Sequence, residues 1–299
     1  MIVRPKPNLI GILTSLKGSI AKRIALRALM VTVLASVIVL IETSHPSYFS
    51  KFSATPFTLL GLSLSIFMSF RNNACYDRWY EARKAWGDVI VEIRSMIRET
   101  VIIKDAAERQ TILSNLCGFA HALNARLRKE NELAASSDWL KPMPSANTLD
   151  ISGQILLQVG QQCSALNESG TISEWRYTLM ANHLTALTRS QAICERIKNT
   201  PLPFPYTLLL HRTIYLFCIL LPFAMAEPLG WLTPIFTAIV SYTFFGLDAI
   251  ADELEDPFGR DEHALPTDAI VRSIERDVLA ALGVTELPPL LEPVDFVLS

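Results

Sequence analysis

Three apolar residues, Leu62, Ile66 and Phe70, recur at four-residue spacing in an uncharged segment that ends at residue 70. On a helix this spacing places them on one face, over about 12 Å of its axis. If several copies of the helix surround an axis, the three residues become stacked apolar rings, where an ion loses part of its water and passage can be gated by dewetting. Ordinary packing between helices explains the same spacing, so the constriction is a hypothesis.

A second group that could bind ions is the acidic segment, residues 248–262. Carboxylates at this density could bind Ca²⁺ or concentrate cations at a pore mouth. A solvated helix face explains the same composition, and the segment lacks the twelve-residue pattern of an EF-hand. The identity of any metal therefore stays open. The seven acidic residues are Asp248, Asp252, Glu253, Glu255, Asp256, Asp261 and Glu262.

The chain carries none of the usual sequence patterns of enzymes. Its five histidines are scattered and its five cysteines show no C-x-x-C spacing, so neither set predicts a metal centre. It has no phosphate-binding loop, dinucleotide fingerprint or nucleophile elbow. The net charge of −2 provides no general basic field for nucleic acid. We expect a protein without enzymatic activity or cofactor, with reduced and buried thiols.

The elements that would position the candidate residues are apolar helices. Residues 24–41 and 55–70 form one pair of apolar segments, and residues 213–226 and 229–247 form a second pair, divided by Glu227-Pro228. A spanning helix needs about 20 mostly apolar residues. Small hydroxyl residues in the short second segment favour packing against other helices. The sequence therefore predicts an all-α membrane protein with four transmembrane helices in two hairpins.

The distribution of Lys and Arg predicts how these spans are oriented. Basic residues gather before the first span, after the second and before the third, whereas the loops inside each pair are nearly neutral. Because basic flanks stay on the cytoplasmic side, both termini should be cytoplasmic. Helical spacing of apolar residues elsewhere predicts a cytoplasmic helical bundle, with a loop at 130–150. The expected parts are a cytoplasmic arm (1–23), a first hairpin with a pore-lining second helix (24–70), a cytoplasmic helical region (71–210), a second hairpin (211–247), and a cytoplasmic acidic segment with a helix and tail (248–299).

Three stretches resemble the bestrophin family, and specifically its bacterial branch. They are FRNNACYDRWYEARKAWG at 70–87, TPLPFPYTLLLHRTIYLF at 200–217 and DELEDPFGRDEHALP at 252–266. They follow the expected order and span nearly the whole chain. The resemblance implies a homopentamer in the bacterial inner membrane, with one central pore and four membrane helices per subunit that continue into a cytoplasmic bundle.

The resemblance also assigns roles to single residues. The neck of the family's pore, three apolar residues at four-residue spacing, falls on Leu62, Ile66 and Phe70, the residues already selected by spacing. A second apolar constriction at the cytoplasmic exit is assigned to Met180. The acidic run that helps animal members hold Ca²⁺ is interrupted here, which argues against Ca²⁺ gating. Residues expected near the pore or a subunit interface are Asp252, Glu253, Glu255, Asp256, Asp261 and Glu262.

The function expected from these features is a passive channel for monovalent ions. Its partners would be further copies of the chain, the lipid bilayer and the ions themselves. Na⁺ and K⁺ are expected to be preferred over Cl⁻, because the resemblance to the bacterial branch implies a preference for cations and the acidic segment agrees. The alternatives are an anion channel of the same architecture and a membrane-anchored scaffold or signalling protein. A secondary transporter is a further rival, and it would usually show internal repeats and charged or broken helices at the membrane midplane.

Overall fold

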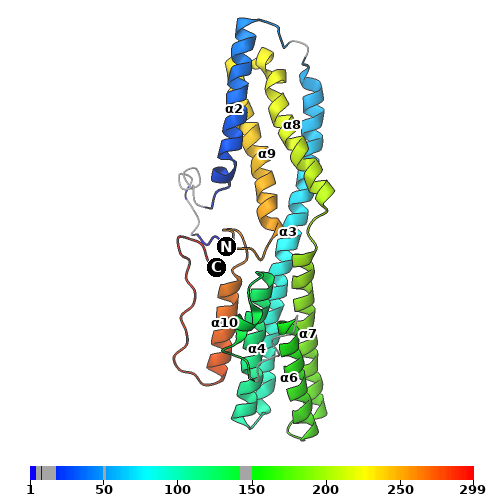
Figure 1. The fold of residues 1–299 in the computed structure, drawn as a ribbon, viewed down its shortest axis with the longest axis vertical. Helices are drawn as coiled ribbons and strands as arrows, with labels where there is room; N and C mark the ends of the chain where they lie inside the picture. The colour runs from blue at the N-terminus through cyan, green and yellow to red at the C-terminus, as the bar shows by residue number, and fades with distance from the viewer. Residues whose placement is uncertain (5–7, 9–17, 50–51, 142–149) are drawn as a thin grey trace. The chain divides into compact units, whose positions relative to one another are not determined.

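The computed structural model describes residues 1–4, 8, 18–49, 52–141 and 150–299, so most of the predicted arm 1–23 lies outside the described residues. Apart from two isolated β-bridges near the chain ends, all regular structure in the described residues is helical. The predicted all-α fold is therefore confirmed. The block at 70–87 lies inside one continuous helix of 46 residues, α3 (Ala54–Glu99), as its helical spacing predicts (Figure 1).

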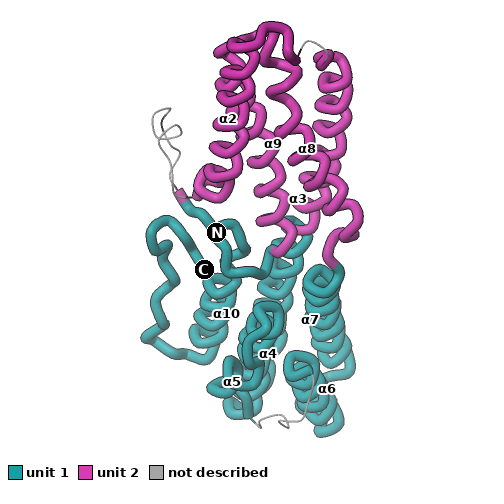
Figure 2. The backbone as a smooth tube through the Cα atoms, turned by 45° about the horizontal axis from the view of Figure 1, so that its top comes forward, with its two compact units in different colours: residues 1–3, 80–200, 257–299 teal, residues 4–79, 201–256 magenta. Residues whose placement is uncertain are grey.

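The chain divides into two compact units, and α3 contributes to both (Figure 2). Unit 1 contains residues 1–3, 80–200 and 257–299, and unit 2 contains residues 4–79 and 201–256. Apart from α3, each described helix belongs to one unit.

Unit 2 is built from apolar helices. They are α2 (Ala21–Ser44), the first part of α3, α8 (Phe204–Leu229), the 3-10 helix η2 (Gly230–Leu232) and α9 (Thr233–Glu255). Their shared core includes Ile24, Met68, Ile214 and Phe245. Many other large apolar residues of these helices point outwards, among them Leu29, Leu40, Leu209, Ile235 and Ile239. Helices that are apolar all round suit a core or a membrane rather than a water-facing surface.

Within the described residues, two stretches are long and apolar enough to cross a membrane. They are Ala21–Ser44 and Phe204–Glu255, and the second contains both α8 and α9. The predicted span at 55–70 is not among them, because its serines lower its hydropathy and charged residues follow directly. Length and composition alone do not separate a spanning helix from a buried one.

Unit 1 is a helical bundle centred on α4. Its helices are the second part of α3, the 3-10 helix η1 (Thr100–Ile102), α4 (Ala106–Leu127), α5 (Glu132–Ser136), α6 (Ile151–Glu168), α7 (Glu174–Asn199) and α10 (Thr267–Ala281). Helix α4 contacts α5, α6, α7 and α10. The predicted helical spacing is confirmed here, since Ile112, Leu116, Phe119, Leu123 and Leu127 are all buried.

The predicted loop at 130–150 needs a correction, because the short helix α5 forms within it. The side chain of Asn131 caps α5 by accepting a hydrogen bond from the backbone N–H of Ala134 at 3.0 Å. The prolines that predicted the loop lie at positions outside the described residues.

All five cysteines are free and buried, as the sequence predicts. Burial raises the pKa of the Cys163 thiol to about 11 and that of the Cys194 thiol to about 12. Because the thiolate is the reactive form, these side chains are inert structural groups at neutral pH.

Candidate functional site

The neck, defined as Leu62, Ile66 and Phe70, lies on an open face of α3. The three side chains are 61%, 48% and 61% exposed. Exposed apolar side chains are common one at a time, but three in register along one helix form a continuous apolar stripe. The fold of a single chain leaves this stripe uncovered.

The opposite face of the same helix segment packs against the rest of unit 2. The buried residues there follow each other at spacings of four, three and four, and at 3.6 residues per turn they lie roughly opposite the neck. They are Leu64, Met68, Arg71 and Cys75. Helix α3 is therefore held from one side, and the neck points away from the helices that hold it.

Arg71, the residue after the neck, is a fully buried cation. Its Nη1 donates to Oδ1 of Asp248 at 2.8 Å and its Nη2 donates to Oδ1 of Asp252 at 2.6 Å. The carboxylate of Glu255 lies 3.7 Å from the same Nη2. A buried charge is tolerated only when it is paired and hydrogen-bonded. The rigid guanidinium fork suits this double contact, which ties α3 to α9 directly beside Phe70.

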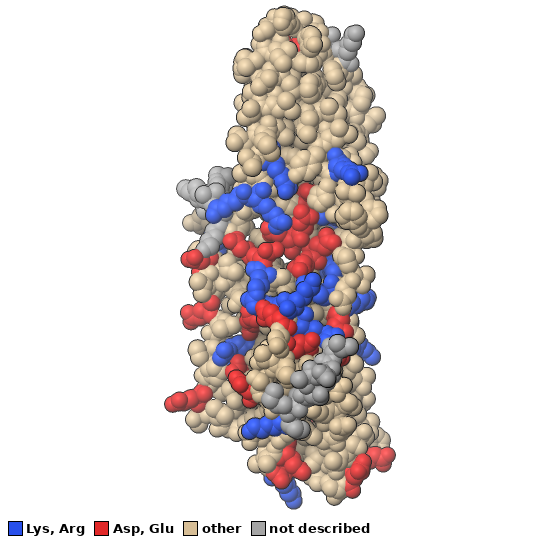
Figure 3. Space-filling model, viewed as in Figure 1, with Lys and Arg blue, Asp and Glu red and all other residues tan. Residues whose placement is uncertain are grey.

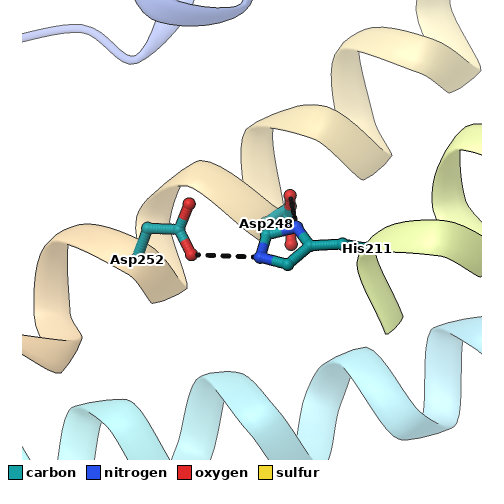
Figure 4. A group of neighbouring side chains, drawn as sticks. All are labelled: His211, Asp248 and Asp252. Atoms are coloured by element: carbon teal, nitrogen blue, oxygen red, sulfur yellow. Dashed lines mark hydrogen bonds and ion pairs between the residues drawn. The ribbon is translucent and has the colours of Figure 1, made fainter. Parts of the chain in front are cut away.

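His211 of α8 lies between the same two aspartates (Figure 4). Its Nδ1 is 2.7 Å from Oδ2 of Asp248, and its Nε2 is 3.6 Å from Oδ1 of Asp252. Sequence analysis missed this group, because it treated His211 as one of several scattered histidines. The four-residue spacing of Asp248 and Asp252 on one helix was the available signal, but the partner comes from another helix.

The acidic segment is engaged in internal contacts. Glu253 pairs with Arg23 at 3.1 Å. Oε1 of Glu255 accepts from the N–H of Leu202 at 3.2 Å, and its backbone carbonyl accepts from Nε of Arg78 at 2.7 Å. Further along, Asp256, Asp261 and Glu262 are exposed.

Charged side chains of both signs intermingle on the face drawn in Figure 3. The surface of the apolar helices of unit 2 is almost free of charge in the same view.

The predicted exit residue Met180 needs a correction. It lies in α7 with no exposed surface, at 0%. A side chain buried within one chain gains no exposure when chains assemble, so in this conformation Met180 cannot line a constriction. Its neighbour Leu179 is 46% exposed, so adjacent positions of α7 differ between the surface and the core.

Comparison with known proteins gives the family. The family model of the bacterial and fungal bestrophins matches residues 1–280. The voltage-dependent anion channel-forming protein mll4386 of Mesorhizobium japonicum is 40% identical over 298 residues, 99% of this chain and 96% of that protein. The voltage-dependent anion channel-forming protein YneE of Escherichia coli K12 is 36% identical, with 98% of each chain covered.

Comparison with solved structures also finds a bestrophin homologue. The crystal structure of a bacterial bestrophin homologue from Klebsiella pneumoniae, phased from zinc, has 36% sequence identity and a TM-score of 0.82. The match covers 88% of this chain and all of that one.

The expected preference for Na⁺ and K⁺ was wrong, because the curated relatives are named as formers of anion channels. The structure gives a physical reason for the error. The carboxylates that suggested cation enrichment include Asp252 and Glu253, which pair with Arg71 and Arg23. Carboxylates paired with arginines inside the fold contribute less to the field at a pore mouth than unpaired ones would.

The match across residues 1–280 and the identity of 36–40% over nearly the full length show that the chain belongs to the bacterial and fungal bestrophin family, a family of membrane ion channels and not of enzymes.

Proposed function

We propose that this chain is the subunit of a passive, voltage-dependent anion channel with an apolar neck. The names of its curated relatives support both the voltage dependence and the anion selectivity. The subunit would assemble as a homopentamer in the bacterial inner membrane, with four membrane helices and both termini in the cytoplasm. Its partners would be other copies of itself, the bilayer and monovalent anions.

The observation that carries the proposal is the direction in which the neck points. Leu62, Ile66 and Phe70 face away from the core of unit 2 and are about half or more exposed. Copies of α3 around a common axis would turn each residue into a ring. An ion that passes an apolar ring loses part of its hydration, so a small change in radius switches conduction.

The outward-facing apolar residues of α2, α8 and α9 support the placement of unit 2 in a bilayer. Residues such as Leu29, Leu40 and Ile239 are 59%, 52% and 57% exposed. Lipid is the solvent that favours such a surface, because every backbone group of a helix is already hydrogen-bonded within it.

Cysteine modification at the neck tests whether this stripe faces a pore or lipid. We expect Ile66→Cys channels to lose most of their current when a membrane-impermeant, negatively charged methanethiosulfonate is added, because the bulky adduct would sit in a ring. The five native cysteines are buried, so the reagent should not change the current of the unmodified protein. The measurement is macroscopic current from purified protein in bilayers, before and after the reagent.

Leu29→Cys is the matched control. Leu29 lies on α2, is 59% exposed and is apolar, yet its side chain would face lipid, so the reagent should leave its current unchanged. If Ile66→Cys is as insensitive as Leu29→Cys, the neck faces lipid and the proposed pore is wrong.

A further inference from the structure

Two polar residues that follow the neck, Asn73 and Asp77, lie on the same face of α3 as the neck itself. Helix α3 continues through this region without a break. The two residues come seven and eleven positions after Ile66, which on a helix turns them by only about 20° to either side of it. Both side chains are exposed, as those of the neck are. The space that the neck faces is therefore also the space that Asp77 faces.

The charge of Asp77 has no partner within the fold. Side chains three or four residues apart on a helix can pair. None of the four residues at these distances from Asp77 is basic: they are Asn73, Ala74, Tyr80 and Glu81. The next residue in the chain, Arg78, is directed elsewhere, since its Nε donates to the backbone carbonyl of Glu255 at 2.7 Å. Among the described residues, Asp77 forms no ion pair.

Fixed charge on this face of α3 lies on one side of the neck only. From Ala54, where the helix begins, to the end of the neck at Phe70 there is no charged residue. Asp77 follows Phe70 by seven residues, or about 10.5 Å along the helix axis. The field of a charge reaches about 10 Å in 0.1 M salt and about 3 Å in 1 M salt. The charge of Asp77 therefore acts on ions at this end of the neck in dilute salt and is screened in concentrated salt.

We propose that Asp77 forms a ring of negative charge in the pore wall beside the cytoplasmic end of the neck, where it lowers the local concentration of anions and slows their entry from that side. The inference rests on the proposed function, because each copy of α3 around the axis supplies one carboxylate. An aspartate that faces water is negatively charged at neutral pH, and rings of charged side chains control ion flow in channels. Because the ring stands at one end of the neck, the channel carries more anion current in one direction than in the other.

The test is single-channel recording of purified protein in planar bilayers with equal KCl on both sides, at 0.1 M and at 1 M. Asp77→Asn is the sharpest variant, because it removes the charge and keeps nearly the same size. We expect its conductance at 0.1 M to exceed that of the unmodified protein about two-fold or more, and the difference to vanish at 1 M. Its currents at opposite voltages should also become more nearly equal at 0.1 M.

Two further variants serve as controls. Asp77→Glu keeps the charge and should conduct like the unmodified protein. Glu108→Gln removes one charge from an exposed position on another helix, α4, and should leave the conductance unchanged at both salt concentrations. If Asp77→Asn matches Glu108→Gln, the charge of Asp77 lies outside the pore and the inference is wrong. An equal rise of conductance at 0.1 M and 1 M, or a rise shared by Asp77→Glu, would also overturn it, because neither effect comes from charge.

The reversal potential of each variant under a KCl gradient distinguishes failure of this inference from failure of the proposed function. An unchanged conductance in Asp77→Asn, with a reversal potential near that of chloride, would overturn the ring and leave the anion channel standing. A fall in conductance at 0.1 M, with a reversal potential near that of K⁺, would overturn both, because a ring of carboxylates that speeds conduction is one that attracts cations.

Discussion

Replacement of Arg71 by methionine is expected to lower the free energy of unfolding by about 3–5 kcal/mol per chain. Arg71 has no exposed side-chain surface, and Asp248, which it pairs with at 2.8 Å, is 1% exposed. Without the guanidinium, the carboxylate of Asp248 would stay buried with no balancing charge from α3. The cost comes from that stranded charge rather than from the loss of an attraction.

Denaturation of detergent-purified protein, followed by circular dichroism, measures this effect. Arg71→Lys should recover only part of the loss, because an ammonium group cannot span Asp248 and Asp252 as the guanidinium fork does. Arg196→Met is the control. Arg196 pairs with Glu81 at 2.6 Å, but the two side chains are 61% and 46% exposed, and such surface pairs contribute about 0–1 kcal/mol. Equal stabilities of Arg71→Met and Arg196→Met would contradict the role given to Arg71.

Replacement of Ile66 by alanine is expected to raise the single-channel conductance several-fold. Ile66 is the middle residue of the neck and is 48% exposed. Each subunit would contribute one copy to the ring, so one substitution widens the ring from every side at once. A wider ring lets an ion keep more of its water. The same change should increase the fraction of time that the channel is open.

The measurement is single-channel recording of purified protein in planar bilayers. Leu29→Ala removes similar apolar volume from an exposed position on α2 and should leave conductance unchanged. If Ile66→Ala and the unmodified protein conduct identically, the neck is placed on the wrong residues.

Local pattern was enough to predict the helices and to show that Leu62, Ile66 and Phe70 share one helical face, whose role as a neck stays a prediction. The spacing of Leu62, Ile66 and Phe70 is visible in the sequence because helical faces repeat every three to four residues. The buried positions of α4, such as Leu116 and Leu123, follow from the same period. Whether a stripe faces the protein or its exterior is not local, and the structure was needed to place the neck on the open face.

Long-range pairing explains what sequence analysis could not predict. Asp248 and Asp252 meet Arg71 across 177 and 181 residues of chain, so the acidic segment could be mistaken for a source of negative field. His211 joins the same group from a third helix. Met180 was assigned from the family resemblance, and its burial in α7 depends on contacts with the rest of the bundle that no local pattern gives.

The reversal potential of the purified protein in a planar bilayer, under a tenfold KCl gradient, tests the central claim most directly. For an anion channel, we predict a reversal potential near the chloride equilibrium potential, unchanged when K⁺ is replaced by a large organic cation. A reversal potential near the K⁺ equilibrium potential would contradict anion selectivity and show that the apolar neck passes cations.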